Sequence, residues 1–211
     1  MDLIWNGSPR ATWTLILAHG AGASMYSEYM LYFAEQLAHR GIQVGRFNFP
    51  YMVKTIETDR RRPPDRAPKL LEAWQQIISR VRERMPAQDS DQRLAIGGKS
   101  MGGRIASMST HHAGVEALVC LGYPFHPPAK KDKLRIEHLS DINVPTMILQ
   151  GERDIFGTRK EVRGYRLPRK IKMRWLNDGD HSLKPRVRSG VTQTENWDTA
   201  IESICGFLNG L

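Results

Sequence analysis

Short apolar runs alternate with segments of helical periodicity along most of the chain. Near-continuous apolar runs, such as residues 13–18 and 115–121, predict strands buried on both faces, because a strand with one exposed face carries polar residues at every second position. Segments such as residues 26–40 and 70–81 repeat apolar residues every three or four positions, which predicts amphipathic helices. The predicted strands are 13–18, 42–49, 93–97, 115–121, 144–151 and 171–176, and the predicted helices are 26–40, 70–81, 102–112, 158–165 and 197–208.

Strands that alternate with helices over the whole chain predict an α/β fold. We expect a three-layer α/β/α sandwich around a sheet of about six mainly parallel strands, formed by a single domain over residues 1–211. Residues 1–11 are interpreted as a lead-in or as the arm of an edge hairpin. The charged alternate residues of the strand 171–176 place it near an edge of the sheet. Residues 51–68, which contain three prolines, are predicted to form a long loop at the carboxyl end of a strand.

The segment from Ile96 to Arg104 carries the strongest chemical signal. It contains Gly98-x-Ser100-x-Gly102 between an apolar strand and a helix, the pattern of a nucleophile elbow. The glycines allow a turn so tight that it strains the serine backbone and leaves the Ser100 hydroxyl exposed at the strand end. The pattern alone is weak, since a glycine-rich turn that opens a helix can also bind phosphate. Its interpretation therefore depends on residues found later in the chain.

An acidic residue and a histidine come after the serine, at the ends of later strands. In parallel sheets the carboxyl ends of the strands form the ligand-binding edge. Asp154 follows the strand 144–151 and His181 follows the strand 171–176, which gives the order Ser100, Asp154, His181 of an α/β-hydrolase. In this prediction His181 accepts the serine proton and Asp154 orients the imidazole.

Other residues compete for these roles. Glu152 could be the acid instead, Asp154 could cap the following helix, and Asp178 or Asp180 could pair with the nearby histidine. His181 could also be a surface histidine of its loop. His126 and His138 are poorer candidates for the base, because their loops follow a strand that precedes the acid.

The loop after the first strand, residues 19–24, consists of a histidine followed by small residues. Small residues let backbone amides approach a ligand, so the amides of Ala21 and Met101 are predicted to bind an oxyanion. His19 is interpreted as a buried histidine bonded to the loop backbone, in preference to a catalytic group. Substrate contacts are predicted for the aromatic residues that come after strands: Tyr51, Phe125 and Phe156. This chemistry requires no metal and no cofactor.

The formal net charge of +9 adds a question about partners. Basic clusters lie at 60–62, 66–69, 130–133 and 184–188, where they could attract an anionic substrate or an acidic partner, or could form a solvated rim. Aromatic residues are not interleaved with them, which argues against nucleic acid. No apolar run is long enough for a membrane span, and the start of the chain resembles no signal segment. Cys120 and Cys205 have no metal-type spacing, so free thiols and a cytoplasmic location are expected.

The chain resembles the α/β-hydrolase superfamily, and within it the small group similar to Tex30, KANSL3 and dienelactone hydrolases. The residues that carry this resemblance are 18–22, 46–51, 97–104, 150–154 and 180–183. The resemblance implies a small α/β-hydrolase without a cap domain and without the two antiparallel N-terminal strands of larger relatives. It supports a serine hydrolase that acts on a small-molecule carboxylic ester or thioester. A binding or scaffold module with a protein partner is the alternative, because some relatives act within larger assemblies.

Overall fold

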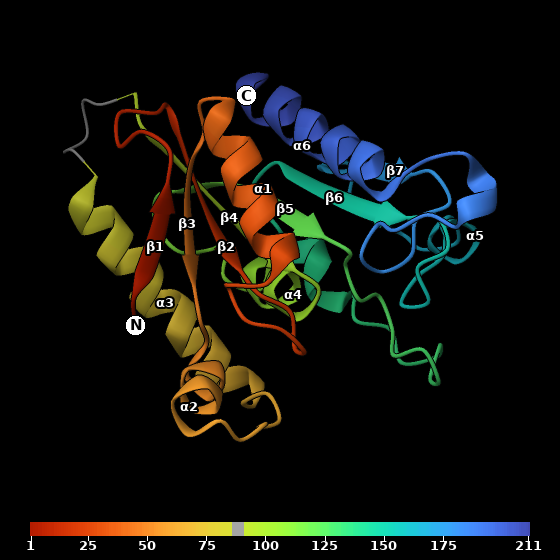
Figure 1. Ribbon diagram of the computed structural model, residues 1–211, viewed down its shortest axis with the longest axis horizontal. Coiled ribbons are helices and arrows are strands. Elements are labelled where there is room, and N and C mark those ends of the chain that lie inside the picture. Colours follow the sequence, from red (N-terminus) through yellow and green to blue (C-terminus); the bar gives the residue numbers. More distant parts are fainter. Residues whose placement is uncertain (86–90) are drawn as a thin grey trace.

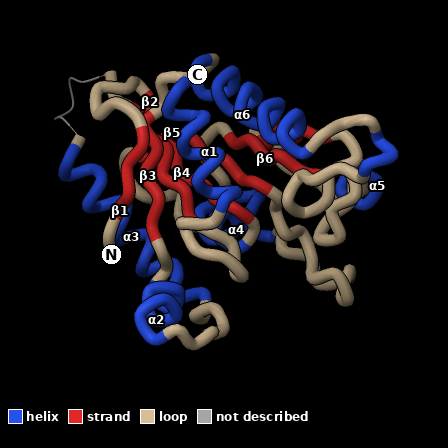
Figure 2. The backbone as a smooth tube through the Cα atoms, viewed as in Figure 1, coloured by secondary structure: helices blue, strands red, loops and turns tan. Residues whose placement is uncertain are grey.

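The computed structural model describes residues 1–85 and 91–211, and these form a seven-stranded sheet with helices on both faces (Figure 1). The strand order is β1-β3-β2-β4-β5-β6-β7, and Figure 2 shows the strands as one twisted layer. Strands β2 to β7 run parallel. The strands are β1 (Leu3–Asn6), β2 (Trp13–Ala18), β3 (Gln43–Phe47), β4 (Arg93–Lys99), β5 (Val115–Leu121), β6 (Thr146–Gly151) and β7 (Ile171–Leu176). The helices are α1 (Glu28–His39), α2 (Pro50–Thr58), α3 (Ala67–Arg84), α4 (Met101–Ser107), α5 (Arg159–Val162) and α6 (Gln193–Asn209).

The mainly parallel α/β sandwich is confirmed, with one strand more than expected. Strand β1 pairs antiparallel with β3, from Leu3 opposite Phe47 to Asn6 opposite Val44. The chain therefore retains one antiparallel N-terminal strand. The residues of β1, Leu-Ile-Trp-Asn, do not alternate between apolar and polar, so the strand lacks the pattern by which a half-buried strand is usually recognised. Strand β7 lies at the other edge of the sheet, as its charged alternate residues predict.

Two apolar cores cover the two faces of the sheet. Along β2, Leu15 and Leu17 pack with α1 and α6 on one face, whereas Ile16 and Ala18 pack with α3 and α4 on the other. This division results from the alternation of side chains along a strand. In Figure 1, α1 and α6 lie together on the near face of the sheet. Within the described ranges, no helix is long and apolar enough to cross a lipid bilayer.

Residues 51–68 are not the continuous loop that their prolines suggest. Pro50 occupies the first turn of α2, where its fixed φ fits a helix and its missing N–H costs nothing. The helix ends at Thr58, and the capping residue Asp59 has a left-handed φ of 49°. A second helix, α3, begins at Ala67 with Pro68 in its first turn. Pro50 and Pro68 thus lie in the first turns of helices, and Pro63 and Pro64 lie in the loop between them.

The turn between β4 and α4 depends on close contact between backbones. Ser100 has φ 52° and ψ −115°, a conformation that is unfavourable for a residue with a side chain, by about 1–3 kcal/mol. A Cβ atom on Gly98 or on Gly102 would lie 2.3 Å from the carbonyl oxygen of Ala18 in β2. Only glycine at these two positions lets the strained turn pack directly against the neighbouring strand.

We expect Gly102→Ala to lower the free energy of unfolding by about 1–3 kcal/mol or more, because its methyl group collides with a backbone carbonyl that cannot move freely. Gly206→Ala is the matched control. Gly206 lies within α6, and nothing lies within 4 Å of the added Cβ. This control should raise the free energy of unfolding by about 0.5–1 kcal/mol through helix propensity. Urea denaturation curves measure both values, and equal stability of the two variants would contradict the packing argument.

Candidate active site

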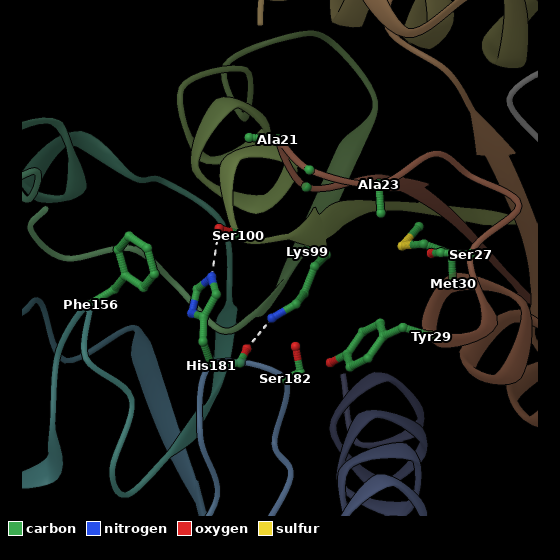
Figure 3. A pocket seen from close by; sticks show the side chains of 12 residues that line it. Ala21, Ala23, Ser27, Tyr29, Met30, Lys99, Ser100, Phe156, His181 and Ser182 are labelled. Carbon is green, nitrogen blue, oxygen red and sulfur yellow. Dashed lines mark hydrogen bonds between the residues drawn. The ribbon is translucent and has the colours of Figure 1, made fainter. Parts of the chain in front are cut away.

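Ser100, His181 and Asp154 form one hydrogen-bonded chain at the carboxyl edge of the sheet. The Ser100 Oγ lies 2.8 Å from His181 Nε2, and His181 Nδ1 lies 2.7 Å from Asp154 Oδ2. The serine follows β4, the aspartate follows β6 and the histidine follows β7, so three separate loops contribute to the site. Figure 3 shows the imidazole directly below the serine hydroxyl.

The carboxylate of Asp154 is fully buried and held by several donors. Gln150 Nε2 donates to Asp154 Oδ2 at 2.8 Å, and the Phe156 amide donates to Oδ1 at 2.9 Å. The cap of the following helix is Thr158, which forms a complete capping box with Glu161. Asp154 therefore does not cap α5, and its position is fixed relative to the imidazole.

The other acidic candidates are bonded elsewhere. Glu152 pairs with Arg159 and accepts a hydrogen bond from the Asp178 amide. Asp178 forms salt bridges with Arg153 and Arg186. Asp180 accepts hydrogen bonds from the amides of Ser182 and Lys184, at 2.7 and 3.0 Å, and so shapes the loop that carries His181.

The other histidines considered for the site, His19, His126 and His138, also have structural partners. The Phe49 amide donates to His19 Nε2 at 3.1 Å, which leaves the proton on Nδ1 to bond the Gly20 carbonyl at 2.7 Å. Burial lowers the pKa of His19 to about 4, so it stays neutral. This is the buried, backbone-bonded role that its sequence position predicts. His138 contacts the hydroxyls of Ser107 and Tyr123, and His126 is fully buried 3.6 Å from Glu161.

The loop after β2 lies against the serine, as an oxyanion-binding loop would. A Cβ atom on Gly20 would lie 3.6 Å from the Cβ of Ser100. Ala21 lines the cavities on both sides of the serine, and Met101, the first residue of α4, lines one of them. The first amides of a helix have no partner within the helix, so the Met101 N–H is available to a ligand.

The three aromatic residues predicted to contact substrate have different positions. Phe156 lines both cavities, and its ring centroid lies 4.3 Å from that of His181. Tyr51 is 2% exposed and donates its hydroxyl proton to the Ala21 carbonyl at 3.2 Å, so it supports the loop from behind. Phe125 is fully buried in the core. The prediction of substrate contact is wrong for Phe125, because its side chain turns inward from a loop that borders the site.

Two cavities open on either side of Ser100. The first has a volume of about 350 Å³ and is lined by the 20–23 loop, Tyr29, Lys99 and His181. The second has a volume of about 310 Å³ and lies toward α4, with Met101, Arg104 and Arg135 in its wall. No cap crosses either cavity in residues 1–85 and 91–211. In the same ranges, no three His, Cys, Asp or Glu side chains gather as metal ligands.

Lys99 is a site residue that sequence reasoning missed. Its ammonium donates to the backbone carbonyl of His181 and lies 5.1 Å from the ring centroid of Tyr29 (Figure 3). Burial lowers the Lys99 pKa to about 8, although the carboxylates of Asp154 and Asp180 oppose this shift. Lys99 occupies the first x of the Gly-x-Ser-x-Gly pattern, where any residue is allowed, so the pattern did not point to a role for it in the site.

Burial and nearby charges set the protonation of His181. Burial lowers its pKa below the usual 6.5, the hydrogen bond to Asp154 opposes this, and the Lys99 ammonium lowers it further. The imidazole is therefore neutral at pH 7, with Nε2 facing the serine hydroxyl.

Some of the basic residues near this edge form salt bridges and others border a cavity. Lys69 pairs with Asp65, Lys131 with Glu161, and Arg186 with Asp178. Arg61 and Arg62 border a shallow cavity beside Ala21 and Gly22. The predicted basic rim is thus partly present, and several of its members serve local salt bridges.

Comparison with known proteins agrees with this architecture. A family model described as an alpha/beta hydrolase domain matches residues 11–209. The fold is similar to that of an α/β serine hydrolase without a lid from Xanthomonas campestris, with a TM-score of 0.73, 18% identity and coverage of 96% of this chain and 87% of the other. The fold is also similar to that of an esterase from Pyrococcus furiosus, with a TM-score of 0.66, 16% identity and coverage of 94% of this chain and 82% of the other. For a dienelactone hydrolase from Anabaena variabilis the TM-score is 0.64 and the identity 18%, with coverage of 98% of this chain and 93% of the other. Since the family model spans nearly the whole chain, this protein belongs to the alpha/beta hydrolase domain family.

Proposed function

We propose that the protein is a serine hydrolase that cleaves a carboxylic ester or thioester through a covalent acyl-enzyme. The observation that carries this proposal is the alignment of Ser100, His181 and Asp154 through contacts of 2.8 and 2.7 Å, with the carboxylate buried. A neutral imidazole that contacts a serine hydroxyl at the wall of an open cavity is arranged for proton removal. The likeness to an esterase fold supports an ester as the class of substrate.

Each group has one role in the reaction. Ser100 attacks the substrate carbonyl while His181 Nε2 takes its proton, and Asp154 stabilises the resulting imidazolium. The amides of Ala21 and Met101 bind the oxyanion of the tetrahedral intermediate. His181 then gives the proton to the leaving alcohol or thiol. Water repeats the sequence on the acyl-enzyme and releases the acid.

The alternative is a scaffold that retains the fold without turnover. A module that only binds a partner gains nothing from a strained serine or from a buried carboxylate bonded to a histidine. The backbone conformation of Ser100, with φ 52°, costs free energy on folding, and it orients the hydroxyl for nucleophilic attack. The enzyme is therefore the better-supported proposal, and reactivity of the serine separates the two.

A fluorophosphonate probe should label the folded protein at Ser100, because its hydroxyl is activated by His181. We expect labelling to be lost in Ser100→Ala and retained in Ser203→Ala, whose serine lies on α6 and bonds the Thr199 carbonyl. Gel fluorescence and peptide mass spectrometry measure the label and its position. A folded wild-type protein that stays unlabelled would support the scaffold.

Asp154→Asn should lower kcat by about 10⁴, because the amide cannot hold the imidazole in the reactive tautomer. Glu152→Gln is the matched control, since Glu152 is nearby in sequence and contacts Arg159 instead of the histidine. Initial rates with p-nitrophenyl acetate measure both. A larger loss in Glu152→Gln than in Asp154→Asn would show that Asp154 is not the acid.

The pH profile of kcat/KM should rise through a midpoint below 6.5, since only neutral His181 can accept the proton and its pKa is lowered. Lys99→Met removes a cation that lowers this pKa, so the midpoint should move to higher pH. Lys170→Met should leave the midpoint unchanged. Lys170 is exposed and precedes β7, so it lies at the amino end of that strand, away from the site at the carboxyl ends. A midpoint that does not move in Lys99→Met would show that the two groups are not coupled.

A further inference from the structure

The second cavity beside Ser100 contains two arginines from different parts of the chain. Arg104 lies on α4, one turn beyond the serine, with its amide bonded to the Ser100 carbonyl at 3.0 Å. Arg135 belongs to the segment between β5 and β6. Both residues line the cavity of about 310 Å³, as do Ser100, Met101 and Phe156.

The positive charge of these arginines has no protein partner in residues 1–85 and 91–211. The lysines and arginines that form salt bridges in these ranges are Lys69, Arg93, Lys131, Arg153, Arg159 and Arg186. The Nε of Arg104 is buried and has no hydrogen-bond acceptor within the same ranges. One carboxylate, that of Asp65, also lines the cavity, but it bonds Lys69 Nζ at 2.9 Å and the Tyr51 amide at 3.0 Å.

The main chain around Arg135 is fixed from both sides. Its amide donates to the Phe125 carbonyl at 2.8 Å, and its carbonyl accepts the proton of the Tyr123 hydroxyl at 2.8 Å. Tyr123 and Phe125 are themselves fully buried. The backbone of Arg135 is therefore held to a buried part of the core beside the cavity that this residue lines.

Two like charges in one half-buried cavity repel each other unless a ligand compensates them. Burial lowers the pKa of Arg135, and the neighbouring Arg104 charge lowers it further. Guanidinium groups remain charged despite such shifts and bind carboxylates or phosphates through paired N–H donors. An oxyanionic group between the two guanidinium groups would compensate both positive charges.

We propose that Arg104 and Arg135 form a subsite for an oxyanionic group, a carboxylate or a phosphate, carried by the ester that Ser100 attacks. This inference rests on the proposed function and narrows its substrate class to anionic esters. The cavity extends from the nucleophile itself, so a substrate seated at Ser100 can place its charged end on the arginines without crossing the other cavity.

Pairs of esters matched in size and different in charge test the subsite. On the acyl side, the p-nitrophenyl half-ester of glutaric acid carries a carboxylate, and p-nitrophenyl pentanoate is its neutral counterpart. On the alcohol side, 4-acetoxybenzoate and 4-acetoxyphenyl phosphate are compared with methyl 4-acetoxybenzoate, which distinguishes a carboxylate from a phosphate. We expect kcat/KM to be higher for at least one anionic ester than for its neutral counterpart, and this preference to weaken with added salt.

Substitution of the arginines should change this preference selectively. Arg135→Gln and Arg104→Gln should each lower the ratio of kcat/KM for the anionic ester to that for the neutral ester by about tenfold, the cost of one charged hydrogen bond. Arg135→Lys, which keeps the charge and loses the paired donors, should lie between Arg135→Gln and wild type. Arg169→Gln is the matched control, because this exposed arginine precedes β7 and lies at the amino end of that strand, away from the site at the carboxyl ends.

The outcomes separate the two proposals. If Ser100 reacts with the fluorophosphonate probe in all variants and the charge ratio does not change with either arginine, the subsite is wrong and the hydrolase stands. If folded wild-type protein is unreactive toward the probe and hydrolyses none of the esters, both proposals are overturned. Thermal denaturation of each variant shows that the comparison is made between folded proteins.

Discussion

The close contact between the turn after β4 and the neighbouring strand β2 is the constraint on which the site depends. The carbonyl oxygen of Ala18 would lie only 2.3 Å from a Cβ atom on Gly98 or on Gly102. This contact holds Ser100 at φ 52° and turns its hydroxyl away from the sheet. Since β2 also leads into the 19–24 loop, one strand both supports the nucleophile and carries the loop that lies against it.

A second layer of contacts fixes the histidine. Its side chain is held by Asp154, a buried carboxylate that also bonds Gln150 and the Phe156 amide. Its main-chain carbonyl accepts a hydrogen bond from the side chain of Lys99, the residue that precedes the nucleophile. The imidazole is thus fixed from two sides, and the lysine cation also favours its neutral form. The position and the protonation of His181 have a common structural origin.

Because no cap covers the sheet edge in the part of the chain that the structure describes, recognition has to come from the walls beside the serine. The two cavities there differ in chemistry: one is bounded by small residues, Tyr29 and Lys99, and the other by Arg104 and Arg135. Both cavities share Ala21, Ser100 and Phe156 in their walls, whereas His181 lines only the first of them. Selectivity in such an open site would depend on a few fixed charges more than on enclosure.

The sequence by itself determined the fold class, the six parallel strands and the order of Ser100, Asp154 and His181, because these result from local periodicity and from the turn chemistry of glycine and proline. It left residues 1–11 open as a lead-in or the arm of an edge hairpin and did not predict that β1 pairs with β3. It missed α2, because prolines begin helices as well as end them. Only the tertiary structure selected Asp154 over Glu152, turned Phe125 inward, and brought Arg104 and Arg135 into one cavity. Those outcomes depend on the direction of side chains from separate loops, which spacing along the chain does not specify.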